Sequence, residues 1–282
     1  MTSLFKRLFE KMQKPVLPSR DVHALMRPLA TPAIHVRKSA SPSRSHLGSV
    51  PALPPGIGWP EHKGRRLGFL AQLWLPDIHA AHAIGWLPAT GSLLFFYDID
   101  EQPWGFDPAD RGSARVLYVP PPAAASFETD DLLSKADTVL PYQALNFFKI
   151  DVFPSSQHPS VLTLELSDQE LDTFCDTADA MFGTLPQHQV AGYPAPVQND
   201  DMERDCQLVT NGLYLGTETA YGTEAARKLD SAPNDWTLLL QVDTDDSLGI
   251  MWGDAGKLYF WVEKKAARVG DFSNVWTILH CT

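Results

Sequence analysis

The sequence predicts an α+β protein rich in antiparallel sheet, with two similar β-rich halves from internal duplication and a few peripheral helices. Short apolar or aromatic runs bounded by turn residues recur along the chain, and three of them reappear later in the same order. A chain of 282 residues is long enough to bury a large core. Three cysteines without a Cys-x-x-Cys pair, and no long apolar run, predict a cytoplasmic protein without a transmembrane segment.

The predicted strands fall into two series with matching order. The first series comprises residues 67–74, 92–98 and 114–119, and the second comprises residues 236–243, 257–262 and 275–279. Residues 188–196 repeat the pattern of 46–54, and residues 256–262 repeat that of 91–97. We therefore expect one globule made of a basic segment (1–45), a first repeat (46–160) and a second repeat (161–282).

Helices are predicted at the edges of these repeats. A strand over residues 161–166 leads into a helix over 167–182, because Ser167 and Glu170 form a capping box and Gly183 stands where a helix ends. A second helix is predicted near the N-terminus, where prolines restrict it to residues 19–26. Residues 1–14 form a basic amphipathic pattern, which predicts docking on the protein's own core or weak peripheral contact with a membrane.

Charge is divided unevenly along the chain. Residues 1–66 hold 12 Lys and Arg against 3 acidic residues, whereas residues 67–282 hold 11 against 31. An acidic body repels nucleic acid, so we expect no nucleic-acid partner and instead a basic protein partner. The alternative is that the basic segment lies against the acidic body of the same chain.

A set of motifs then resembles a known family. The set comprises residues 46–54 (HLGSVPALP), 69–73 (FLAQL), 91–97 (GSLLFFY) and 252–261 (WGDAGKLYFW), together with Trp59-Pro60. It resembles the YwqG-like proteins, a bacterial family of unknown function, over residues 34–282. The resemblance implies a compact mixed fold without an established activity. The position of some relatives near polymorphic toxin genes implies an immunity-like role, and Ser49 stands where the family usually has a glycine.

Four carboxylates are the main candidates for chemistry. Asp243, Asp245, Asp246 and Asp254 lie within twelve positions, and oxygen-rich clusters bind Ca²⁺ or Mg²⁺. Leu248 stands where a calcium loop requires glycine, so the pattern also fits a solvated turn between two strands, with Asp254 accepting hydrogen bonds from turn amides. No catalytic residue, metal or cofactor is assigned.

Two glutamines and a tryptophan complete the candidate binding residues. Gln72 and Gln241 are amides within apolar strands at the same place of each repeat, so they join structural hydrogen-bond networks or line a shared cleft. Trp252 opens the longest motif.

Asp77, His79 and His82 have the spacing of an incomplete metal site or of a surface helix. Cys175 falls on an apolar helix face, which favours a small buried hydrophobe over a nucleophile. Two function classes follow: a non-catalytic binding protein, immunity-like in its sharpest form, or a metal-dependent hydrolase or other small-molecule enzyme using the aspartates.

Overall fold

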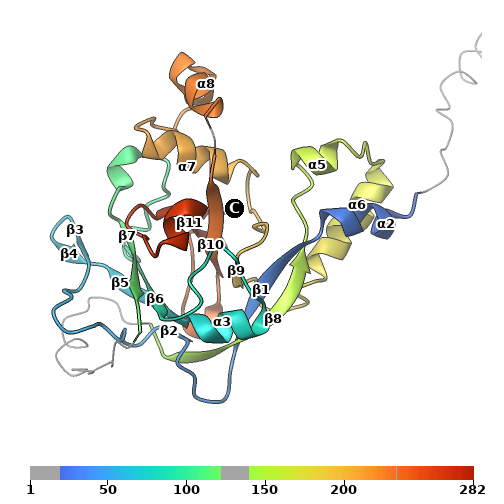
Figure 1. Ribbon diagram of the computed structural model, residues 1–282. Coiled ribbons are helices and arrows are strands. Elements are labelled where there is room, and N and C mark those ends of the chain that lie inside the picture. Colours follow the sequence, from blue (N-terminus) through green and yellow to red (C-terminus); the bar gives the residue numbers. More distant parts are fainter. Residues whose placement is uncertain (1–19, 122–139, 233) are drawn as a thin grey trace, which may run out of the picture.

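The chain is built on one large antiparallel sheet that curls around a core (Figure 1). The computed structural model describes residues 20–121, 140–232 and 234–282, so the predicted helix over residues 1–14 lies outside the described chain. The strand order is β12-β11-β10-β9-β1-β8-β2-β5-β6-β7. These strands are β1 (Thr31–Lys38), β2 (His46–Leu47), β5 (Gly68–Trp74), β6 (Ser92–Tyr97), β7 (Ala114–Val119), β8 (Gln143–Val152), β9 (Gln189–Val190), β10 (Trp236–Asp243), β11 (Lys257–Glu263) and β12 (Trp276–His280). The short β3 (Glu61–His62) and β4 (Arg65–Arg66) pair separately.

The centre of the sheet is the pair of β1 and β8, which runs from Thr31 opposite Val152 to Lys38 opposite Leu145. On each side of this pair lie a two-residue strand and then three longer ones: β9, β10, β11 and β12 on one side, and β2, β5, β6 and β7 on the other. We call β10–β12 and β5–β7 the two arms. In both arms the ladder of the first two strands is interrupted by an irregularity, at residues 69–71 and at residues 238–240.

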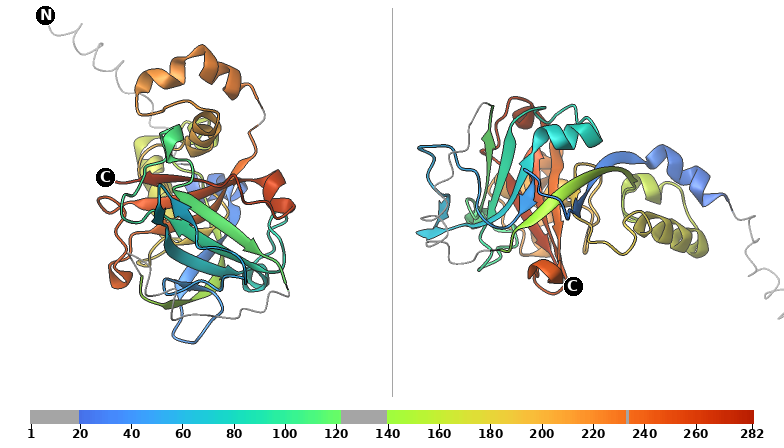
Figure 2. Two further views of the ribbon diagram at one scale, coloured as in Figure 1. Left: turned by 90° about the vertical axis from the view of Figure 1, so that its left-hand side faces the viewer. Right: turned by 90° about the horizontal axis from the view of Figure 1, so that it is seen from below.

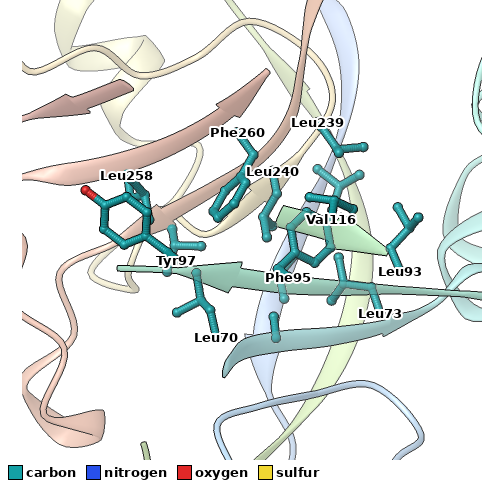
Figure 3. Close-up of a cluster of buried hydrophobic side chains, with 14 of the residues drawn as sticks. Leu70, Leu73, Leu93, Phe95, Tyr97, Val116, Leu239, Leu240, Leu258 and Phe260 are labelled. Carbon is teal, nitrogen blue, oxygen red and sulfur yellow. The ribbon is translucent and has the colours of Figure 1, made fainter. Parts of the chain in front are cut away.

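The core lies between the two arms. Because side chains alternate across a strand, one face of each arm points inward. Figure 3 shows inward residues of β5, β6 and β7 meeting those of β10 and β11. Phe95 and Phe260 pack edge to face with ring centroids 5.2 Å apart. In the last motif, Leu258, Phe260 and Val262 share this core, while Tyr259 and Trp261 face the other way.

Helices cover the outer face of the β10–β12 arm. On α7 (Met202–Thr210), Met202, Cys206 and Val209 pack against Tyr259 and Trp261, and α8 (Glu224–Asp230) adds Ala226 to the same cluster. Two further short helices, α3 (Leu75–Ala81) and α9 (Lys264–Arg268), follow directly on β5 and β11.

A second group of helices projects beside the ends of β1 and β8 (Figure 2). It contains α2 (Val22–Met26), α5 (Pro159–Leu162) and α6 (Asp168–Asp179), which meet through Met26, Val161 and Phe174. The capping box at the start of α6 is confirmed, but the helix ends at Asp179 instead of residue 182, and the chain then turns through Gly183 at φ +62°.

The strand predicted over residues 161–166 is wrong. Residues 161–162 end α5 and a turn follows, because Pro159 suits the first turn of a helix and the His158 ring accepts a hydrogen bond from the Ser160 amide. The helix predicted over residues 19–26 is the shorter α2.

The turn at Ser49 keeps a left-handed backbone. Gly48 and Ser49 have φ of +63° and +61°, and a Cβ on Gly48 would lie 2.2 Å from the Pro141 carbonyl oxygen. Serine therefore occupies the strained position at a cost on the order of 1 kcal/mol. Ala191 and Gly192, after β9, form a second left-handed pair at +59° and +75°.

Two basic side chains of the N-terminal segment contact the acidic body. Arg20 Nη2 lies 2.9 Å from Glu170 Oε2, and Lys38 Nζ lies 2.6 Å from Asp245 Oδ2. The intramolecular attraction expected from the charge distribution is therefore present in the described part of this segment. No helix among the described residues is long and apolar enough to cross a membrane.

Candidate functional site

The four aspartates, considered above as cation ligands or as turn residues, do not share a common partner. Asp243 Oδ2 accepts a hydrogen bond from the Gln187 amide at 2.8 Å, and Asp245 is buried against Lys38. Asp246 and Asp254 are exposed. No group of three or more potential metal ligands occurs among the described residues. The carboxylates therefore do not assemble a cation site there.

Asp245 holds the turn to the rest of the fold. Its carboxylate contacts Lys38 Nζ at 2.6 Å and His188 Nε2 at 3.4 Å, and accepts a hydrogen bond from the Ser247 hydroxyl at 2.8 Å. Burial opposes the charge, but the hydrogen bonds from His188, Lys38 and Ser247 together hold the pKa of Asp245 well below its usual range. Asp245 is thus an ionised structural anchor between the end of β1 and the turn after β10.

The expected role of the Asp254 side chain is wrong. Its carboxylate is exposed, whereas its backbone carbonyl accepts hydrogen bonds from the amide and hydroxyl of Thr282, at 3.2 and 2.8 Å. The left-handed residues of this turn are Gly253 and Ala255. Gly256 is needed for close packing instead, since a Cβ there would lie 2.0 Å from the His280 carbonyl oxygen.

The two glutamines bind backbone in the same manner. Gln72 Oε1 accepts from the Ala52 amide at 2.9 Å, and its Nε2 donates to the Arg44 carbonyl at 2.9 Å. Gln241 Oε1 accepts from the Ala195 amide at 2.9 Å, and its Nε2 donates to the Gln187 carbonyl at 2.6 Å. Each amide therefore joins two points of the segment that contains the short strand next to its arm, β2 for Gln72 and β9 for Gln241.

Trp252 lies in the core. It is 1% exposed, and its ring packs against Tyr97 at a centroid distance of 5.8 Å. Its position lets it shape the turn that follows but prevents it from contacting a partner directly.

Two side chains that the sequence analysis did not select are exposed beside this turn. Trp104 is 52% and Met251 is 47% exposed. Gln102 joins their loops, since its Nε2 donates to the Met251 carbonyl at 3.1 Å and its Oε1 accepts from the Gly253 amide at 2.9 Å. Gln102 itself adopts φ +46°, a strained angle that is more frequent at functional sites.

Two acidic residues belong to the same two loops as these apolar side chains. Glu101 is 67% exposed and lies 3.4 Å from Arg65, and Asp254 follows Met251 by three positions. Both loops lie against residues 279–282. The Trp104 carbonyl accepts a hydrogen bond from the Leu279 amide, and the Asp254 carbonyl accepts one from the Thr282 amide. We call Glu101, Gln102, Trp104, Met251 and Asp254 the Trp104 surface. An aromatic residue in a polar turn was the only sequence feature that pointed to it.

The remaining candidates have structural positions. His79 lies on α3 and contacts the Pro88 carbonyl at 3.1 Å, but His82 caps the helix with extended backbone, so the two do not share a helix face. Cys175 is half-buried on α6, and burial raises the pKa of its thiol, which disfavours the nucleophilic thiolate.

The curled sheet with its two arms and the helices around it define an α+β protein. The chain belongs to the DUF1963 family, a domain of unknown function whose model matches residues 45–281. The match begins after β1, the strand at the centre of the sheet. No curated protein matches the chain. The resemblance to YwqG-like proteins stays a prediction.

Proposed function

We propose that this protein is a non-catalytic binding protein whose Trp104 surface docks a basic segment of another protein. The observation that carries the proposal is the exposure of Trp104 and Met251 on two loops that Gln102 joins and that also carry the exposed Glu101 and Asp254. Tryptophan is enriched among the residues that dominate binding energies, and exposed acidic groups steer partners of the opposite charge. The 31 acidic residues among positions 67–282 add a long-range field of the same sign.

The divergent aspartates favour this proposal over a metal-dependent hydrolase. A hydrolase of that class holds its metal with several converging ligands, whereas Asp243 and Asp245 bind protein groups. The most specific version of the binding proposal is an immunity-like role, in which the basic partner is a toxin. A toxin that acts on nucleic acid presents a basic surface of the kind required here.

We also infer that the two arms arose by internal duplication. Three features support it: the matched strand order outward from β1 and β8, the matched irregularities in the two ladders, and the equivalent bonds of Gln72 and Gln241. The strand pairing favours repeats that begin at β1 and at β8, earlier than the predicted division at residues 46 and 161.

Site-specific photo-crosslinking tests the binding proposal. The crosslinking residue p-benzoylphenylalanine is placed at position 104 in the native host, and at Leu162 on α5, which is at least as exposed, as a control. We expect adducts with a basic protein from position 104 alone. With that protein purified, Trp104→Ser should weaken binding by about 2 kcal/mol, roughly 30-fold, and the association rate should fall as salt rises.

Leu162→Ser should leave the affinity unchanged. The proposal is wrong if positions 104 and 162 capture the same proteins, or if the captured partner binds Trp104→Ser as tightly as the wild type.

A further inference from the structure

A cavity of about 330 Å³ lies between α6, the end of β8 and the loop over residues 187–196. One part of its wall is apolar and contains Phe174, Phe182 and Tyr193. The polar part contains Asp179, Gln187, Gln189 and Lys257. Its size suits a small organic molecule, and an apolar wall with a few polar groups is typical of ligand pockets.

Lys257 is a half-buried cation without a carboxylate partner. Its Nζ donates to Gln187 Oε1 at 2.5 Å and to the Ala195 carbonyl at 3.1 Å, both of which are neutral. None of the ion pairs within 4.0 Å among the described residues includes it. Burial lowers the pKa of Lys257, against the opposing fields of Asp243 and Asp179. An anion bound beside Nζ would offset this cost.

Gln189 supplies an unpaired acceptor on the same wall. The side chain is fully buried, and its Nε2 donates to the carbonyls of Ala191 and Tyr193 at 2.6 and 2.7 Å. Because both partners are acceptors, they fix the orientation of the amide. Gln189 Oε1 is then buried without a partner among the described residues, which is unfavourable unless a donor binds there.

The other arm shows that the glutamine-held loop does not require this lysine. In the ladder of Gln241, Asp243 stands opposite Lys257, whereas in the ladder of Gln72 the corresponding pair is Trp74 and Ser92. Gln72 nevertheless makes both of its backbone bonds. Lys257 is therefore an addition to the shared structural pattern.

We propose that this cavity binds a small carboxylic acid that carries an apolar group and an amino or hydroxyl donor. The carboxylate lies beside Lys257 Nζ, the donor bonds to Gln189 Oε1, and the apolar group packs on Phe174, Phe182 and Tyr193. This site goes beyond the proposed protein-binding function and shares no residue with the Trp104 surface.

Calorimetric titration and thermal shift of the full chain test the site with four probes. Phenylalanine and phenyllactate carry all three features and distinguish an amino from a hydroxyl donor, phenylacetate lacks the donor, and phenethylamine lacks the carboxylate. We expect saturable binding of phenylalanine or phenyllactate, weaker binding of phenylacetate and none of phenethylamine. Lys257→Met should weaken the preferred acid by about tenfold or more, while Lys265→Met, at an exposed lysine, should bind like the wild type.

A second, cavity-filling variant tests the site independently in case Lys257→Met does not fold. Ala178 lines the cavity from α6, so Ala178→Phe should abolish binding while the unfolding midpoint stays near that of the wild type. The proposal is overturned if neither phenylalanine nor phenyllactate binds the wild type at millimolar concentration. It is equally overturned if a bound acid is unaffected by both Lys257→Met and Ala178→Phe.

Discussion

Asp205 on α7 is a carboxyl group with no exposed surface. Its Oδ1 accepts a hydrogen bond from the Tyr221 hydroxyl at 2.9 Å, and its Oδ2 has no partner among the described residues. Burial raises its pKa to about 6, against the opposing hydrogen bond. Burial likewise raises the pKa of the neighbouring Glu203, to about 7. Burial therefore favours the protonated form of both carboxyl groups in the folded protein.

The contribution of Asp205 to the free energy of unfolding should therefore fall with rising pH. An unfolded Asp titrates near about pH 4. The stabilisation from Asp205 is thus complete below that pH and is lost as pH rises through about 6. Asp205→Asn removes this titration. Between about pH 4.5 and pH 8 the variant should therefore lose about 1–3 kcal/mol less of its free energy of unfolding than the wild type, as measured by urea unfolding. Asp172→Asn, at an exposed site on α6, should keep the wild-type pH dependence; an equal dependence in Asp205→Asn would contradict the assignment.

At this scale the sequence predicted groups that build structure better than groups that bind. Gln72 and Gln241 were selected because amides are unusual in apolar strands, and both hold loops. Lys257 was not selected, because a lysine at the start of a strand resembles a solvated strand end until burial is known. The Trp104 surface depends on two loops distant in sequence, so no local pattern contains it.

At the scale of elements, α6 depends on its first turn. Ser167 Oγ accepts a hydrogen bond from the Glu170 amide. Glu170 Oε2 in turn accepts hydrogen bonds from the Ser167 amide at 2.9 Å and from the Arg20 guanidinium at 2.9 Å. Ser167→Ala should lower the free energy of unfolding by about 1 kcal/mol, and Glu170→Ala by more, because Arg20 also loses its partner. Denaturant unfolding measures both, with the exposed loop variant Ser41→Ala as control. Equal stabilities of Ser167→Ala and Ser41→Ala would show that the cap contributes nothing.

The strands of the arms were predictable because each is a compact apolar run between turns. The predicted residues 236–243 and 114–119 are those of β10 and β7. The central strands β1 and β8 were missed. β1 contains Pro32, and β8 alternates irregularly between buried and exposed positions. Their stability comes from pairing with each other across more than a hundred residues, which neither local sequence contains.

At the scale of the whole molecule, the two arms share one core and should unfold together. Phe95 and Phe260 belong to opposite arms and are in contact. A double-mutant cycle of Phe95→Leu and Phe260→Leu should give a coupling of about 0.5–1.5 kcal/mol. Phe95→Leu combined with Phe174→Leu, in the separate α2–α6 cluster, should be additive. Circular dichroism and tryptophan fluorescence should give one coincident transition, and two separate midpoints would mean that the arms fold independently.

The pairing of β1 with β8 also sets the order in which the protein can form during synthesis. Thr31 leaves the ribosome long before Val152, its partner in the ladder. β1 therefore remains without β8 while the whole β5–β7 arm is translated. During that interval β2 also lacks its partner in β8, and the apolar inner face of the arm is uncovered. Such distant pairings slow folding and prolong the exposure of aggregation-prone strand edges. A nascent chain arrested between β7 and β8 is therefore the form of this protein that most needs a chaperone.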